Sequence, residues 1–211
     1  MSEDEARAWL EAKLDVSRET LARLESLVEL VTTESQRQNL IAASTLPTIW
    51  DRHVVDSAQL LALAPAGAGS WLDLGSGAGF PGMVVAAIAR SIEMVLVESR
   101  RKRIDFLTHV AETLGVSDRV TIAGSRLELI ETRSFDVISA RAFAPLDRLL
   151  PLAARFSTPK TVWLLPKGRG AASELAAARS SWQGDFRIVA SVTDPDAAII
   201  VARNVQPKGR R

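Results

Sequence analysis

The first 64 residues carry hydrophobic side chains at helical spacing, with polar residues on the opposite faces. Ser2 and Glu5 form a capping-box pattern, which predicts that one helix begins near residue 3. A second helix follows, and Pro47 is placed to begin a third, because proline fits the first turn of a helix. The apolar faces of the first two helices are Ala6, Trp9, Leu10 and Leu14, then Leu21, Leu24, Leu27, Val28 and Val31.

From residue 71 the pattern changes to short apolar runs that alternate with helical stretches. Such alternation is typical of a parallel sheet with helices on both faces. Gly115 is placed to end the second helix of this region. Strands are predicted at 71–74, 92–98, 119–123, 135–140, 161–166, 186–193 and 197–204, and helices at 81–90, 100–114, 145–156 and 170–182.

The last two predicted strands are separated only by Asp194-Pro-Asp196. This segment is too short for a crossover, so the two strands must pair as an antiparallel hairpin. A doubly wound sheet that ends in such a hairpin is typical of class I methyltransferases, whereas dinucleotide-binding sheets keep their sixth strand parallel. We therefore expect a Rossmann-like α/β fold with a seven-stranded, mostly parallel sheet. Residues 1–66 would form a helical extension packed on a domain of residues 67–211.

Three glycines, Gly75, Gly77 and Gly79, follow the first predicted strand. They can adopt positive φ and leave no Cβ in the way of a ligand. A dinucleotide fingerprint would need its third glycine where Phe80 stands. Asp73 can instead accept hydrogen bonds from a ligand ammonium, such as the amino-acid end of S-adenosylmethionine. A tight turn that binds no ligand is the alternative interpretation.

Glu98 ends the second predicted strand, at the position where a carboxylate can bind both hydroxyls of a ribose. The alternative is a surface acid paired with Arg100 or Arg101. After the third strand, Ser125-Arg-Leu-Glu128 enters the loop that in this architecture lies beside an adenine ring. Alone, this second observation is a weak indication.

Two basic residues stand at the carboxyl ends of strands, where open sheets bind their ligands. Arg141 follows the fourth strand and is the leading catalytic candidate, although an arginine that only bridges a loop is also possible. Lys167 ends the fifth strand and either meets RNA phosphate or is a plain exposed lysine. His53 and Asp56 lie three residues apart on the third predicted helix. They are either a buried hydrogen-bonded pair that ties this helix to the sheet or contacts for a substrate.

The amino-acid composition excludes some classes of reaction and binding site. The chain has no cysteine and two histidines, which excludes thiolate nucleophiles and argues against a metal site. It has no apolar run of membrane-spanning length, and its acidic start is unlike a signal peptide, so a cytoplasmic location is expected. A formal net charge of +1 means that any nucleic acid must be held by local patches.

The run Arg100-Arg-Lys-Arg103 is one such patch, because cations at a helix start oppose the helix dipole and are better explained by attraction for an anion. Arg101 and Lys102 are therefore candidate RNA contacts, together with His53 and Lys167. The tail residues Lys208, Arg210 and Arg211 are basic and are expected to be frayed.

The sequence resembles the RsmG (GidB) family of bacterial ribosomal RNA methyltransferases over nearly its whole length. The resemblance implies cofactor contacts at Gly75, Phe80, Leu127, Glu128 and Arg141. Two positions depart from the family pattern, which often has Asp in place of Glu98 and Gly in place of Arg101. The matching motifs are Asn39-Leu40, Arg52-His-Val-Val-Asp56-Ser57, Leu74-Gly-Ser-Gly-Ala-Gly-Phe-Pro-Gly82, Lys102-Arg103 with Phe106-Leu107, Ser125-Arg-Leu-Glu128, Arg141-Ala-Phe-Ala144 and Lys167-Gly168.

This resemblance implies methylation of N7 of a guanine in the 530 loop of 16S ribosomal RNA, with S-adenosylmethionine as the methyl donor. The partner would be the RNA or a small-subunit particle, and the protein would act as a monomer without a metal. Because N7 carries a lone pair and loses no proton when methylated, such a reaction depends on positioning rather than on a general base. The alternatives are a methyltransferase for another RNA or a small molecule, and a cofactor-binding ribosome assembly factor without catalysis.

Overall fold

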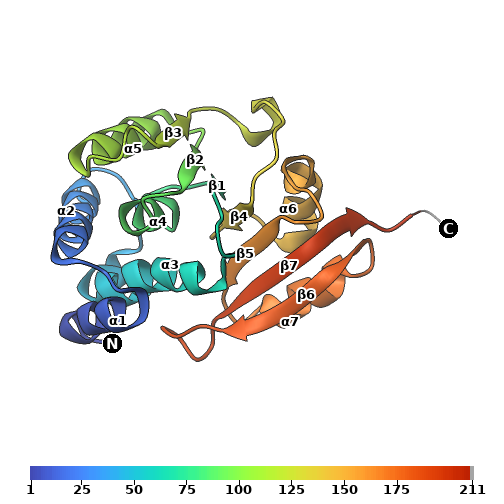
Figure 1. Cartoon of the computed structure of the whole chain (residues 1–211), viewed down its shortest axis with the longest axis horizontal. Helices are drawn as coiled ribbons and strands as arrows, with labels where there is room; N and C mark the ends of the chain where they lie inside the picture. The colour runs from blue at the N-terminus through green and yellow to red at the C-terminus, as the bar shows by residue number, and fades with distance from the viewer. Residues whose placement is uncertain (210–211) are drawn as a thin grey trace.

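Apolar strands form a central sheet with helices on both faces, in a computed structural model that describes residues 1–209 (Figure 1). The strand order is β3-β2-β1-β4-β5-β7-β6. All pairings among the first five strands are parallel, whereas β7 runs antiparallel to both β5 and β6. The predicted mostly parallel sheet with a closing hairpin is therefore confirmed. The tail residues Arg210 and Arg211 lie outside the described part of the chain.

The strands are β1 (Ser70–Leu74), β2 (Glu93–Val97), β3 (Val120–Ala123), β4 (Val137–Ala140), β5 (Val162–Lys167), β6 (Trp182–Ala190) and β7 (Ala198–Pro207). The α-helices are α1 (Glu3–Leu14), α2 (Arg18–Glu34), α3 (Asp56–Ala58), α4 (Gly82–Ile88), α5 (Arg101–Thr113), α6 (Leu146–Ala153) and α7 (Ala171–Ala178). Shorter helical turns are η1 (Ala43–Thr48), η2 (Trp50–Val55), η3 (Gln59–Leu63), η4 (Leu127–Leu129) and η5 (Ala154–Phe156).

Local signals place the helix ends where the sequence predicts them. The Ser2 backbone N–H donates to the Glu5 carboxylate at 2.7 Å, and the Glu5 N–H donates to the Ser2 hydroxyl at 3.2 Å, so the capping box is formed. Gly115 takes a φ of +62° just after α5, and the Val116 N–H returns to the Ala111 carbonyl. This is the Schellman arrangement that ends many helices.

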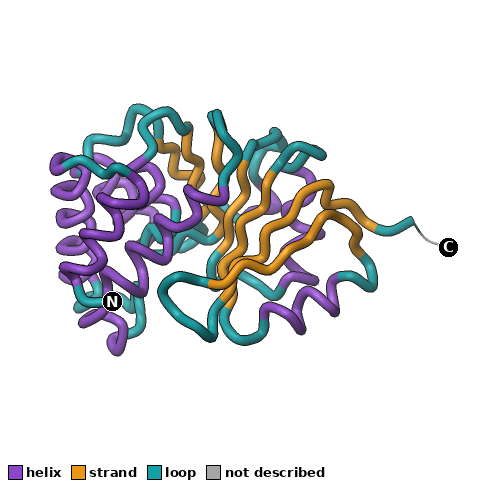
Figure 2. Tube along the Cα trace, turned by 60° about the horizontal axis from the view of Figure 1, so that its bottom comes forward, coloured by secondary structure: helices purple, strands orange, loops and turns teal. Residues whose placement is uncertain are grey.

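The two faces of the sheet belong to two hydrophobic clusters. Along β1, Trp71 joins the cluster that includes α4, α5 and the N-terminal helices, while Leu72 joins the cluster under α6 and α7. Leu10 and Leu24 of the N-terminal helices share the first cluster with Met83 of α4, so the N-terminal segment packs on the sheet domain. Figure 2 shows these helices gathered at one end of the molecule, with the strands of the sheet side by side next to them.

The third predicted helix is present as a helical segment, residues 43–63, but it is not a regular α-helix. Pro47 does not begin an α-helix but lies inside the 3₁₀ turn η1, where its missing N–H leaves no gap in an α-helical ladder. The chain then passes through the wide π-helical turn η2 and the single α turn α3 before it ends in η3. Such π turns occur often at functional sites, and this one carries His53.

The boundary between α7 and β6 also differs from the prediction. The helix ends at Ala178 rather than at residue 182, and the strand begins at Trp182 rather than at residue 186. Trp182 is buried in the second cluster and aligns with Pro207 of β7, with a register shift between Gln183 and Asp185. Cross-strand packing of this tryptophan therefore overrides the helical pattern of the preceding residues.

Gly82 offers a test of how tightly the first turn of α4 packs on the sheet. A Cβ at this position would lie 2.1 Å from Leu96 Cδ2 and 3.0 Å from an oxygen of Asp73. We expect Gly82→Ala to lower the free energy of unfolding by about 1–3 kcal/mol, as overpacking of a dense core does. Gly168→Ala is the control, since a Cβ there meets no atom within 4 Å. Urea denaturation of both variants measures the difference, and equal stability would contradict the packing.

Candidate functional site

The glycine turn is anchored by a buried chain of hydrogen bonds. The Trp71 indole N–H donates to the Ser139 hydroxyl at 2.8 Å, and this hydroxyl donates to the Asp73 carboxylate at 2.7 Å. The second Asp73 oxygen accepts from the Gly82 N–H at 3.3 Å. Burial raises the pKa of Asp73, while these donors oppose the shift. Because Asp73 is fully buried, the prediction that it meets a ligand ammonium directly does not match this structure; it holds the turn from behind.

The three glycines of the turn have positive φ, at +67° for Gly75, +56° for Gly77 and +92° for Gly79. At Gly75 a Cβ would lie 2.4 Å from the Phe143 ring, so packing within the protein requires the glycine. At Gly77 the nearest atom would be the Arg103 guanidinium at 3.6 Å. A Cβ there would make only ordinary van der Waals contacts, so the positive φ rather than packing accounts for this glycine.

Glu98 lies against the glycine turn. Its Oε2 accepts from the Gly77 N–H at 3.2 Å, and its Oε1 accepts from the N–H groups of Ser99 and Arg100 at 2.7 and 2.9 Å. A carboxylate at the start of α5 also complements the helix dipole. The guanidinium nearest to it belongs to Arg103, at 3.7 Å, and not to Arg100 or Arg101 as the alternative interpretation held.

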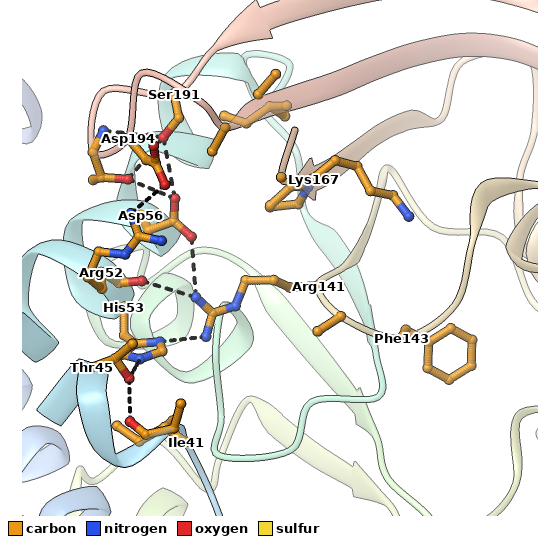
Figure 3. Close-up of a pocket in the computed structure, with 18 of the residues that line it drawn as sticks. Ile41, Thr45, Arg52, His53, Asp56, Arg141, Phe143, Lys167, Ser191 and Asp194 are labelled. Carbon is orange, nitrogen blue, oxygen red and sulfur yellow. Dashed lines mark hydrogen bonds and ion pairs between the residues drawn. The ribbon is translucent and has the colours of Figure 1, made fainter. Parts of the chain in front are cut away.

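Arg141 leaves the end of β4 and reaches the turn η2 (Figure 3). Its Nη1 donates to the Asp56 carboxylate and to the Arg52 carbonyl, each at 3.2 Å, and its Nη2 donates to His53 Nδ1 at 2.8 Å. The His53 ring stacks on Phe80 with centroids 5.0 Å apart, and the guanidinium lies 5.4 Å from the same ring. Arg141 therefore bridges two segments. It joins His53 and Asp56, whereas one of the two interpretations from the sequence had them hydrogen-bonded to each other.

His53 is held neutral in this cluster. Arginine offers no acceptor, so the Arg141 contact fixes Nδ1 as the acceptor and leaves the proton on Nε2, which donates to the Thr45 hydroxyl at 2.9 Å. Burial, with Arg141 and Arg52 nearby, lowers the pKa of His53 to about 3. Because both ring nitrogens make hydrogen bonds, His53 serves as a hydrogen-bond acceptor for Arg141 and is not free to act as a base.

A cavity of about 720 Å³ opens beside this cluster, at the carboxyl ends of β4 and β5. Its walls come from η1, η2, the loop 141–145 and the tip of the β6–β7 hairpin. This is the edge of the sheet at which open α/β folds bind ligands. Three of the predicted site residues line this cavity: His53, Arg141 and Lys167. Its wall also contains residues that were not predicted from the sequence, namely Thr45, Phe143, Glu174 and Asp194.

Lys167 is neither exposed nor free. Its ammonium donates to the Ala144 carbonyl at 3.0 Å and pairs with Glu174 at 2.8 Å, and the same carboxylate accepts from the Leu146 N–H at 2.9 Å. The alternative of a plain exposed lysine is wrong, because only 11% of the side chain is exposed. Lys167 ties α7 to the loop that carries Arg141. Glu174 stands only seven positions later, but it lies on a different element, and spacing alone did not indicate that strand and helix bring the two side chains together.

The remaining predicted residues lie outside this cavity. Leu127 is buried in η4, and the neighbouring Glu128 is exposed. Arg101 and Lys102 are exposed on the first turn of α5, where Arg101 pairs with Asp105 at 2.9 Å. Within residues 1–209, no three acidic or histidine side chains are grouped so as to hold a metal ion. Over the same residues, no helix has the length and apolar character to cross a membrane.

The neutral His53 gives stability a specific pH dependence. Since its folded pKa lies below the unfolded value of about 6.5, protons favour the unfolded chain, and the stabilisation is lost progressively as pH falls from about 6.5 toward 3. We expect protonation of this histidine in the unfolded chain to lower the free energy of unfolding by about 2 kcal/mol between pH 7.5 and pH 5. His53→Gln should remove that part of the pH dependence in denaturation experiments at the two pH values.

His109 is the matched control, because it is the other histidine of the chain and is exposed on α5. His109→Gln should retain the pH dependence of the unaltered protein. If His53→Gln and the unaltered protein lose the same stability between pH 7.5 and pH 5, His53 is not buried as a neutral ring.

Solved structures with a similar fold include methyltransferases of distant sequence. The O-methyltransferase from Bacillus cereus in complex with SAH has a TM-score of 0.62 and 16% identity, covering 93% of this chain and 96% of that chain. A SAM-dependent methyltransferase from Aquifex aeolicus has a TM-score of 0.59 and 15% identity, covering 80% and 96%. At this level of identity the likeness shows the fold, and it confirms the predicted Rossmann-like methyltransferase architecture.

Relatives in sequence are much closer. A "Ribosomal RNA small subunit methyltransferase G" from Rhizorhabdus wittichii is 64% identical over 211 residues, which covers all of this chain and 96% of the relative. The protein with the same name from Zymomonas mobilis is 51% identical and covers all of this chain and 98% of the relative. The family model "GidB: rRNA small subunit methyltransferase G" matches residues 20–199. The resemblance seen in the motifs is thereby confirmed, and the chain belongs to the GidB family.

Proposed function

We propose that this protein transfers a methyl group from S-adenosylmethionine to N7 of a guanine in the 530 loop of 16S ribosomal RNA, in the cytoplasm. The observation that carries the proposal is Arg141, which stands at the switch point between β1 and β4 and lines the cavity. Phe143 of the same wall lies against Gly75 of the glycine turn. The family and the names of the relatives support ribosomal RNA as the acceptor.

The residues around the glycine turn fit S-adenosylmethionine. Gly75, Gly77 and Gly79, all with positive φ, form the glycine-rich turn against which such a cofactor would pack. Glu98, which accepts from the Gly77 N–H, is the carboxylate that would bind the ribose hydroxyls. The resemblance adds Phe80, Leu127, Glu128 and Arg141 as contacts. When bound, the cofactor supplies an electrophilic methyl group on a sulfonium. Asp73 contributes indirectly, through its bonds to Ser139 and Gly82.

The acceptor chemistry agrees with the groups in the cavity. Guanine N7 attacks with a lone pair and releases no proton, so the protein must orient the base rather than deprotonate it. The one histidine in the cavity wall is occupied by Arg141 and Thr45 and is not free to act as a base. A site built from positioned donors therefore suits an N7 acceptor.

The Arg141 guanidinium has N–H donors that its partners in the described residues do not use. A guanidinium carries five N–H groups, and three are used by Asp56, Arg52 and His53. Within the described residues, two N–H groups are thus left for an acceptor. Guanine O6, a phosphate and the cofactor carboxylate are each suitable, since arginine is planar and stays charged. Arg141 would contribute to catalysis by orienting one of these groups through its free donors.

Two other functions compete with this proposal. A methyltransferase for another RNA or a small molecule would use the same cofactor site, and the exposed Arg101 and Lys102 favour an RNA acceptor over a small molecule. An assembly factor that binds the cofactor without catalysis would show no turnover. Transfer of a radiolabelled methyl group to 16S RNA or to small-subunit particles, followed by identification of the methylated base, separates all three functions.

In the same assay we expect Arg141→Ala to reduce the single-turnover rate by about a hundredfold, or roughly 3 kcal/mol. Arg141→Lys should restore only part of the rate, because lysine lacks the planar fork. Arg169→Ala is the control, as its exposed guanidinium pairs with Asp196 outside the cavity wall. A normal rate in a fully bound Arg141→Ala complex would remove Arg141 from the mechanism.

The basic start of α5 is the proposed RNA contact outside the cavity. Replacement of both Arg101 and Lys102 by Glu should weaken RNA binding. It should also reduce the slope of log affinity against log salt concentration by about two, with cofactor affinity nearly unchanged. Reversal of Lys13 and Arg18, which are exposed near the ends of α1 and α2, is the matched control. Binding titrations at several salt concentrations give the slopes. An unchanged slope for the α5 variant would show that this patch faces away from the RNA.

A further inference from the structure

We infer that Asp56 is a positioning residue for the acceptor site. It directs the guanidinium of Arg141 and fixes the tip of the β6–β7 hairpin, so that two walls of the cavity are set relative to each other before RNA binds. This inference rests on the proposed function, and it answers a question that the sequence left open, whether Asp56 is structural or functional.

Asp56 receives hydrogen bonds from three separate parts of the chain. Its Oδ2 accepts from Arg141 at 3.2 Å, across 85 positions of sequence. Its Oδ1 accepts from the Gln59 amide at 2.9 Å and from the Thr193 hydroxyl at 3.1 Å, the latter across 137 positions. One carboxylate thus joins the helical segment of residues 43–63, the loop after β4 and the hairpin tip, as Figure 3 shows in part.

The hairpin tip, residues 191–197, depends on this carboxylate and on its neighbour Gln59. The Gln59 amide donates to the Ser191 hydroxyl at 3.1 Å and accepts from the Val192 N–H at 3.0 Å. The Ser191 and Thr193 hydroxyls lie 2.9 Å apart, and both face Asp56 Oδ1. The tip is therefore held over the cavity by side chains of the helical segment.

For Arg141, Asp56 is the charged partner. Within residues 1–209, Asp56 provides the carboxylate that pairs with this guanidinium, while its other two partners are the neutral His53 ring and the Arg52 carbonyl. Charge-assisted bonds are stronger and more directional than neutral ones, especially for side chains that are mostly buried. Only 20% of the Arg141 side chain and 16% of the Asp56 side chain are exposed. Loss of the carboxylate would leave the direction of the guanidinium poorly defined.

A second contact at the same hairpin provides a control. Arg169 Nη2 donates to Asp196 of the tip at 2.6 Å, and neither residue lines the cavity. This contact includes neither Asp56 nor Arg141. Asp196→Asn therefore perturbs the hairpin while it leaves the Arg141 pair and the cavity wall intact.

Two substitutions separate the two roles of Asp56. Asp56→Asn removes the negative charge that pairs with Arg141 in either orientation of the amide, while the amide can still hydrogen-bond the hydroxyls of the tip. Asp56→Ala removes both sets of bonds. The asparagine variant thus removes the ion pair to Arg141 alone, and the alanine variant also releases the hairpin.

The experiment uses the full chain with small-subunit particles and radiolabelled S-adenosylmethionine. We expect Asp56→Asn to slow single-turnover methyl transfer by about tenfold at saturating particles, with cofactor affinity by calorimetry changed less than about twofold. Asp196→Asn should transfer at nearly the normal rate. Asp56→Asn combined with Arg141→Ala should be no slower than Arg141→Ala alone, because residues that act as a unit are not additive.

Hydrogen exchange of residues 191–197 supplies a measurement without RNA. Asp56→Ala should increase exchange there, whereas Asp56→Asn should exchange almost as slowly as the unaltered protein. A normal transfer rate in Asp56→Asn, or rate losses that add in the combined variant, would overturn the inference while the proposed function stands. If the unaltered protein fails to methylate the particles, the proposed function fails, and the positioning role fails with it.

Discussion

The buried contact between Asp73 and Ser139 is the interaction on which the site depends. It joins β1 to β4 at the point where the strand order reverses, and the Trp71 indole on one side and the Gly82 N–H on the other complete the hydrogen bonds. A buried carboxylate without such donors would cost several kcal/mol, so the four groups must stay together. In that arrangement the glycine turn and the loop of Arg141 open at the same edge of the sheet, next to each other.

The second constraint is electrostatic. Arg141 and Arg52 both lie beside the buried His53, and this clustering is stable because the histidine is neutral and accepts from Arg141. Asp56 then balances the charge of Arg141, and Asp194 that of Arg52. In the cavity wall the histidine is hydrogen-bonded, and the carboxylates of Asp56, Glu174 and Asp194 are each paired with a basic side chain. Such a wall suits the proposed acceptor, a nucleophile with its own lone pair, and it links the packing of the helical segment to the proposed chemistry.

Distances along the chain set the limit of what sequence patterns could predict. The glycine turn, Glu98 and the capping box are local signals, and each lies where it was predicted. The burial of Lys167 could not be predicted because its partner Glu174 is on another element, and the burial of Asp73 could not because it depends on β4. An RNA contact of Lys167 stays a prediction. The third helix was wrong because propensity does not reveal where a helix widens into a π turn. Division of the chain into domains at residue 66 stays a prediction.

By itself, the sequence determined the order of strands and helices, the closing hairpin, the glycine turn and the family, because periodicity, glycine spacing and short motifs are encoded by neighbouring residues. Only the tertiary structure decided which side chains meet. The convergence of His53, Asp56, Arg141 and the hairpin tip brings together segments up to 137 positions apart. The direction of each donor there depends on how the helical segment packs against the sheet. Burial, which lowers the pKa of His53 and raises the pKa of Asp73, exists only after that packing has formed.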